Sequence, residues 1–115
     1  MDDLTCVTPE GDTRRSACDP GQAAGVMAAL ASPWRIQIVR LLADEELDVS
    51  DIAERLGLSV ANTSHHLGRL RSAGLVMSRR DGTRIANRLA GPQVLGLCAA
   101  ACESVWEPAV VAARS

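Results

Sequence analysis

The sequence predicts a mainly α-helical domain that carries one β-hairpin, in the order α-α-α-α-β-β-α. Three observations support this fold class. Apolar residues recur at helical spacing through most of the chain. A short turn, Gly57–Ser59, separates two of the helical segments, and Asp81-Gly82 joins two runs of strand-forming residues. A chain of 115 residues has room for one such domain.

The predicted domain spans residues 22–106, between two terminal segments. Residues 1–21 are polar, contain proline and glycine and lack periodicity, so we expect a flexible N-terminal arm, which carries Cys6 and Cys18. A first helix is predicted over 22–31, and residues 107–115 form a short C-terminal tail. Ser32 is placed to cap a second helix that has Pro33 in its first position and runs to about residue 43. Its inward stripe should be Trp34, Ile38, Leu41 and Leu42.

The middle of the chain has the pattern of a helix-turn-helix followed by a wing. Ser50 is the expected cap of a third helix, 51–56, and Ser59 is the expected cap of a fourth, 60–73, which Gly74 ends. A three-residue turn between two helices is the helix-turn-helix signature. Strands at 75–80 and 83–89 should join through a type I′ turn at Asp81-Gly82, and a last helix should run from Pro92 to about residue 106. Together these elements predict a winged helix-turn-helix.

Charge is segregated along the chain although the net charge is only −2. Residues 1–49 carry nine acids and four arginines, whereas residues 50–90 carry seven arginines and three acids. A basic middle segment in an acidic chain indicates an anionic partner for that segment, and nucleic acid is the obvious one. A solvated charged face, or a winged helix that binds protein instead, is the competing interpretation.

The predicted fourth helix is suited to the major groove of double-stranded DNA. Thr63, Leu67 and Leu70 form its inward stripe, and it contains no acidic residue that would repel phosphate. Asparagine and serine can bind base edges. Alternation puts Arg79 and Arg80 on opposite faces of the hairpin, so we expect phosphate or minor-groove contacts from Arg80 and Arg84. The full set of predicted DNA-binding residues is Ser59, Asn62, Ser64, His65, Arg69, Arg80 and Arg84.

Neighbouring histidines on this helix point about 100° apart, so they should not chelate one metal. His65 is expected at the DNA, and His66 as a half-buried, hydrogen-bonded residue.

Four cysteines suggest a sensor. Cys98 and Cys102 lie one helical turn apart, too far for an unstrained disulfide but suitable for straddling one soft ion. Thiolate ligands select cadmium, lead, mercury, or trivalent arsenic and antimony. Cys18, and less readily Cys6, would complete the metal site from the arm. The alternatives are that the helical pair is packed in the core or that the thiols form an oxidation switch.

Several motifs resemble the ArsR/SmtB metalloregulators over about residues 25–106. They are residues 30–39, 46–53, Leu58-Ser59, 64–67, Leu70-Arg71, 73–76 and 79–82, and residues 60–67 look most like the CadC-type cadmium/lead sensors, which also carry a cysteine in an N-terminal arm. The resemblance implies a homodimeric repressor that leaves its operator when a metal or metalloid binds.

Two departures from the family pattern bear on the effector site. Asp48 and Ser50 stand where the family's metal-box cysteines would be, and Gly91, Gln93 and Ser104 replace three ligands of its zinc site, leaving Glu107. Any metal site must therefore use other residues.

The chain has no nucleophile elbow, phosphate loop or zinc-protease motif, so we predict no enzymatic activity and no organic cofactor. A polar, acidic N-terminus without a signal peptide, and apolar runs too short to cross a bilayer, predict a cytoplasmic protein without a membrane partner.

Overall fold

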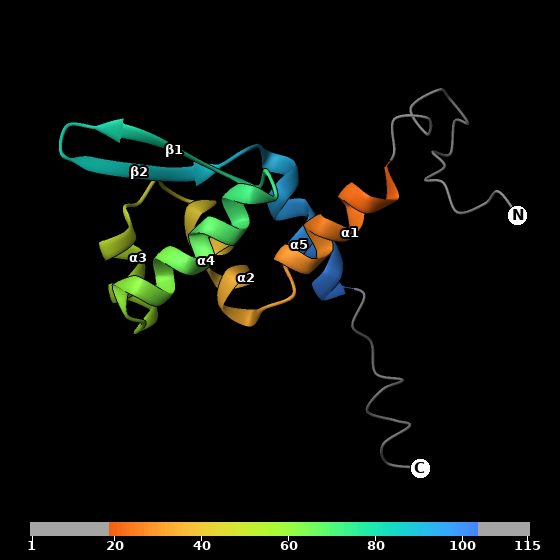
Figure 1. The fold of residues 1–115 in the computed structure, drawn as a ribbon. Helices are drawn as coiled ribbons and strands as arrows, with labels where there is room; N and C mark the ends of the chain where they lie inside the picture. Colours follow the sequence, from red (N-terminus) through yellow and green to blue (C-terminus); the bar gives the residue numbers. More distant parts are fainter. Residues whose placement is uncertain (1–18, 104–115) are drawn as a thin grey trace, which may run out of the picture.

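The computed structural model describes residues 19–103, which form five helices and a two-stranded hairpin (Figure 1). The elements are α1 (Pro20–Ala29), α2 (Pro33–Leu42), α3 (Val49–Leu56), α4 (Val60–Ser72), β1 (Val76–Asp81), β2 (Arg84–Leu89) and α5 (Pro92–Glu103). This order confirms the predicted fold class. In Figure 1 the hairpin extends from the helical body on the side of α3 and α4, while α1 and α5 lie together at the opposite end. No helix within residues 19–103 is long and apolar enough to cross a membrane.

Helix α1 begins two residues earlier than the sequence pattern predicted. The carboxylate of Asp19 caps the helix by accepting a hydrogen bond of 2.9 Å from the backbone N–H of Gly21. Pro20 occupies the first helical position, where its missing N–H costs nothing. Asp19-Pro20 therefore acts as Ser32-Pro33 does for α2, and Pro20 and Gly21 belong to the helix rather than to an arm. The rest of the predicted arm lies outside the described residues.

Helix α3 is capped by Asp48, so the prediction of Ser50 as its cap is wrong. The Asp48 carboxylate accepts a hydrogen bond of 2.8 Å from the backbone N–H of Asp51, which starts the helix at Val49. This bond, together with Arg84, lowers the pKa of Asp48 below its usual value. Gly57 ends the helix in the left-handed conformation (φ 70°), which glycine adopts without a steric penalty.

The hairpin turn lies one residue later than predicted. Asp81 pairs with Arg84, so Gly82 and Thr83 form the two-residue loop. A type I′ turn needs positive φ at both loop residues, but here only Gly82 (φ 67°) has it. Positive φ at the first loop position alone is the pattern of a type II′ turn, so the type I′ prediction is wrong. Both turn types match the twist of the strands, which is why the hairpin itself was predictable.

The core is formed by α2, α3, α4, α5 and the base of the hairpin, and it includes Ala29 of α1. Thr63, Leu67 and Leu70 are all buried, as the stripe of the fourth helix predicted. Other buried core residues are Ile38, Val39, Leu42, Leu47, Ile52, Leu75, Val76, Val94 and Cys98. Trp34 was expected in this core but is 40% exposed, because it lies in the first turn of α2 at the margin of the packed region.

Candidate nucleic-acid interface

Helix α4 presents a polar, acid-free surface whose N-terminal end is set by Ser59. The Ser59 hydroxyl accepts a hydrogen bond of 3.0 Å from the backbone N–H of Asn62, so this predicted DNA-binding side chain has a capping role in the free protein. On the opposite side of the helix, the buried Thr63 hydroxyl donates to the Ser59 carbonyl at 2.9 Å. The cap and the buried stripe together fix which side of α4 faces solvent.

The predicted base-contacting residues lie together on the exposed side of α4. Asn62, Ser64 and His65 are all exposed within the first two turns. In helix-turn-helix proteins it is the N-terminal part of the recognition helix that reaches base edges. The structure therefore exposes all three predicted residues near the N-terminal end of α4, with Asn62 and Ser64 on the two flanks of the helix and His65 between them.

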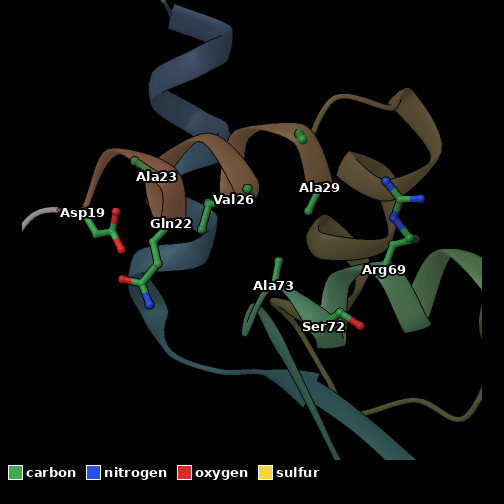
Figure 2. A pocket seen from close by; sticks show the side chains of 10 residues that line it. Asp19, Gln22, Ala23, Val26, Ala29, Arg69, Ser72 and Ala73 are labelled. Atoms are coloured by element: carbon green, nitrogen blue, oxygen red, sulfur yellow. The ribbon is translucent and has the colours of Figure 1, made fainter.

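Arg69 lies further along α4, at one end of a groove of about 750 Å³ between α1 and α4 (Figure 2). Figure 2 shows Ala29 of α1 and Ala73 of α4 pointing toward one another across this groove, with Arg69 at its edge. Seven residues separate Arg69 from Asn62, or roughly 10 Å along the helix axis. Arg69 is four positions from His65, so the two residues are neighbours on one face of the helix and Arg69 lies at the far end of this surface.

His66 connects α4 to the first two helices through Arg35. The Arg35 guanidinium donates to the carbonyl of Ala29 and lies 3.1 Å from Nδ1 of His66. Arginine is only a donor, so Nδ1 must accept and the proton of the neutral ring sits on Nε2. Burial, and then the nearby positive charges of Arg35 and His65, lower the pKa of His66. The prediction of a half-buried, hydrogen-bonded His66 is confirmed, whereas its partner was not visible in the sequence.

The hairpin separates the arginines that the sequence analysis paired. In the observed register Arg80 is opposite Ile85, while Arg79 is opposite Ala86 and Arg84 is opposite Asp81. Cross-strand partners share a face, so Arg80 and Arg84 project from opposite faces of the hairpin. They cannot contact phosphate together from one face. The Arg80 side chain is exposed and has no hydrogen bond or ion pair with any residue in the range 19–103.

Arg79 and Arg84 bind acidic residues that precede or begin α3. Arg79 lies 2.7 Å from Glu46, and Arg84 lies 2.6 Å from Asp48 and 2.7 Å from Asp51. The position that the family resemblance assigns to a metal-box cysteine, Asp48, therefore carries a carboxylate that binds an arginine of the same chain.

A chain of polar contacts joins the recognition helix to the wing, and sequence reasoning missed it. Arg71 of α4 donates to the Ser78 hydroxyl at 3.1 Å, and that hydroxyl donates to the Asn87 side-chain oxygen at 2.7 Å. The amide nitrogen of Asn87 donates to the Leu47 carbonyl at 3.0 Å. Asn87 is 2% exposed. The signal in the sequence was Asn87 itself, a polar residue at a strand position whose neighbours two residues away, Ile85 and Leu89, are apolar.

The two cysteines of α5 lie in different environments. Cys98 is 3% exposed and belongs to the core, whereas Cys102 is exposed. Burial, and then proximity to Cys102, raise the pKa of the Cys98 thiol, which disfavours the thiolate that binds metals. No group of three or more metal-binding side chains occurs among residues 19–103. Cys6 and Cys18, the other predicted ligands, lie outside the described residues. The α5 pair supplies donors suited to soft ions, but it does not by itself complete a site.

The fold, the capped acid-free helix and the hairpin beside it define a winged helix-turn-helix domain. The family described as "bacterial regulatory protein, arsR family" matches residues 32–78, which span α2 to the start of β1. The chain belongs to this ArsR family. Membership confirms the resemblance found in the sequence.

Named relatives include a cadmium-resistance regulator and other HTH-type transcriptional regulators. The cadmium resistance transcriptional regulatory protein CadC of Listeria innocua is 33% identical over 100 residues, which cover 83% of this chain and 84% of that protein. The HTH-type transcriptional regulator KmtR of Mycobacterium tuberculosis is 44% identical over 69 residues, which cover 60% of this chain and 53% of that protein. The chain spans about half the length or less of two further curated relatives, 39% and 52%.

A solved structure with the same fold comes from Mycobacterium bovis. It is described as a homodimeric winged helix-turn-helix DNA-binding domain (fragment 1–100) of a possible ArsR-family transcriptional regulator. It shares 39% identity with this chain at a TM-score of 0.69, covering 82% of this chain and 86% of its own.

Proposed function

We propose that this protein is a cytoplasmic, homodimeric transcriptional repressor that binds double-stranded operator DNA through α4 and the wing. The observation that carries the proposal is α4 itself: its apolar stripe is fully buried, while its exposed side holds Asn62, Ser64 and His65 and no acid. Asparagine pairs with adenine edges and serine with either type of base. Arg80, at the exposed end of the wing, would bind the phosphate backbone beside the groove.

The helices at the far end from the wing support a dimer. No charged residue occurs between Pro20 and Trp34 in the sequence, or between Gly91 and Cys102. Met27 of α1 is 71% exposed, and Leu95 and Leu97 of α5 are 38% and 44% exposed. Uncharged helices that expose large apolar side chains are typical of a surface that a second copy covers. A two-fold dimer would place two copies of α4 roughly 34–36 Å apart, one turn of the DNA helix.

Binding to a labelled duplex from the promoter upstream of its own reading frame tests this function. We expect a Kd of about 10⁻⁸ M or tighter at moderate salt, weakening steeply as salt rises. Asn62→Ala should reduce the preference for that duplex over a mixed-sequence duplex, and Arg80→Ala should weaken both equally. Gln37→Ala, an exposed change on α2, is the control. Absence of salt-sensitive binding, with reductant and chelator present, would indicate a protein-interaction domain instead.

We further propose that a soft metal or metalloid releases the repressor from DNA. Support comes from the cysteine spacing on α5 and from the cadmium-resistance relative. Because Cys98 is buried, the site would need Cys102 together with Cys18 or Cys6 from outside the described residues. Cadmium and lead are the first candidates, followed by arsenic(III), antimony(III) and mercury.

An anaerobic titration distinguishes metal sensing from the alternative, thiol oxidation. Cadmium, lead or arsenite added to the reduced protein should produce sulfur-to-metal charge-transfer absorption and release the labelled duplex. Cys98→Ser with Cys102→Ser should bind DNA normally but lose this release. Release by peroxide in the presence of chelator, without a metal response, would favour the redox switch. Normal metal release by the double variant would remove α5 from the effector site.

A further inference from the structure

Three acids from the segment before α3 and its first turn bind two arginines of the wing, and Asp81 of the hairpin itself lies 4.0 Å from Arg79. We infer that Glu46, Asp48 and Asp51 withhold Arg79 and Arg84 from DNA, so that Arg80 is the arginine at the wing tip that contacts phosphate. The inference rests on the proposed function, because it concerns how the wing meets the duplex. It also changes the prediction from sequence, in which Arg80 and Arg84 acted together.

The backbone places these acids on the wing. Leu47 forms a short antiparallel bridge with Asn87, through hydrogen bonds of 2.9 and 3.2 Å between their backbones. The segment before α3 therefore runs beside β2 as an added edge. Side chains alternate along such a segment, so Glu46 and Asp48 project to the face opposite Leu47.

The same face of the hairpin carries Arg79 and Arg84, which are opposite Ala86 and Asp81 in the register. Asp51, in the first turn of α3, reaches the same guanidinium as Asp48 does. The ion pairs thus follow from the strand register and are not chance surface contacts. Arg80 projects from the other face, where no acid pairs with it among the described residues.

Ion pairs in the folded chain therefore neutralise part of the positive charge that the sequence analysis assigned to DNA binding. Residues 50–90 hold seven arginines, and three of them bind acids of the described chain: Arg55, Arg79 and Arg84. Arg55 pairs with Glu45 at 2.9 Å. For Arg84 to reach DNA, one phosphate group would replace two carboxylates, and both carboxylates would remain unneutralised near an anionic duplex. Isolated exposed ion pairs exchange easily, but this pairing of one guanidinium with two carboxylates opposes the exchange.

Neutralising the two acids tests the inference, with a 30-base-pair mixed-sequence duplex as the probe. We expect the double variant Asp48→Asn, Asp51→Asn to bind this duplex about three- to tenfold more tightly at roughly 0.1 M salt, with a salt slope steeper by about 1, the signature of one additional phosphate contact. Asparagine caps helices as well as aspartate does, so the start of α3 is retained. Thermal unfolding followed by circular dichroism verifies that each variant is folded.

The matched control removes two acids that make no ion pair within residues 19–103. Asp44→Asn with Glu54→Gln changes the net charge equally but should alter affinity less than about twofold at that salt concentration, because no arginine is freed. Arg84→Ala should have little effect in the natural chain, yet it should abolish the gain of the Asp48→Asn, Asp51→Asn variant. Arg80→Ala should weaken binding in both backgrounds.

The inference fails if Arg84→Ala weakens the natural chain as much as Arg80→Ala does, or if both acid-neutralised pairs bind alike. It also fails if the Asp48→Asn, Asp51→Asn variant shows no gain while remaining folded. Failure of the proposed function is a different result: the natural chain itself would show no salt-sensitive binding to any duplex.

Discussion

At the scale of single residues, Asn87 is the polar group on which the position of the wing depends. Its side chain is buried, and it joins Leu47 before α3 to Ser78 on β1, which in turn contacts Arg71 of α4. Every buried side-chain nitrogen and oxygen atom within residues 19–103 has a partner. A buried polar side chain with all its partners specifies one arrangement of the elements around it, at the cost of being intolerant to change.

Asn87→Ala should therefore destabilise the fold by about 1–3 kcal/mol, since it removes the hydrogen bonds of a buried amide and leaves a small cavity. Ser78→Ala, which removes only the exposed part of the network, should cost about 0.5–1 kcal/mol. Urea denaturation of both variants measures the difference. Equal losses of stability in the two variants would mean that the buried amide of Asn87 contributes no more than its hydrogen bond to Ser78.

His66 predicts a pH dependence of stability. Its pKa in the folded protein lies below the value of about 6.5 expected for the unfolded chain. Below that value the unfolded state binds more protons, so the free energy of unfolding falls as the pH drops from about 6.5 through the lowered pKa, and it is constant above. His66→Gln should remove this dependence, whereas the exposed variant His65→Gln should retain it. Thermal unfolding between pH 5 and 8 is the measurement, and an unchanged slope in His66→Gln would contradict the assignment.

At the scale of elements, local signals in the sequence predicted the helices and the hairpin but not their contacts. Ser32-Pro33 and Ser59 cap α2 and α4 as expected, because a capping side chain acts on a backbone N–H only two or three residues away. Asp48 was missed because Asp48 and Ser50, two positions apart, both offered good caps. A bond to Arg84, 36 residues along the chain, adds to the cap that Asp48 forms. The pairing of Arg79 and Arg84 with acids was unpredictable for the same reason. It depends on contacts between the hairpin and acids 33 to 36 residues away along the chain. The shift of the turn by one residue leaves Arg79 and Arg84 on the same face, so it is not the cause.

Substitutions at Ser59, the N-cap of α4, distinguish its contribution to stability from its contribution to DNA affinity. Ser59→Ala should destabilise the protein by about 1 kcal/mol through the lost cap. Ser59→Asp should keep the stability within about 0.5 kcal/mol, because aspartate caps well and favours the helix N-terminus. The added charge should still weaken DNA binding by about fivefold, the effect of roughly 1 kcal/mol between charges about 4 Å apart in water. Ser59→Asn, capped but neutral, is the control. If Ser59→Asp bound DNA as well as Ser59→Asn, the N-terminus of α4 would not lie against the duplex.

At the scale of the whole molecule, the two ends of the domain differ in the partner they suit. The end with α3, α4 and the wing carries the charged and polar groups, while α1 and α5 at the other end carry exposed apolar side chains and no charge before Glu103. The Arg35 contact with both Ala29 and His66 links these ends through α2.

The proposed dimer predicts that one substitution far from α4 weakens DNA binding. Leu97 is 44% exposed on α5, so replacing it with glutamate should not disturb the core of a single chain. In a two-fold interface the charge would be buried against its own copy, which is costly because neither carboxylate gains a partner. We expect Leu97→Glu to be monomeric in sedimentation experiments and to lose at least tenfold in affinity for the promoter duplex, since the two α4 helices would no longer bind as a unit. Met77→Glu, at a similarly exposed apolar position on the wing, should stay dimeric. If Leu97→Glu remained dimeric with unchanged affinity, the interface would have to lie elsewhere, and the uncharged faces of α1 and α5 would need another explanation.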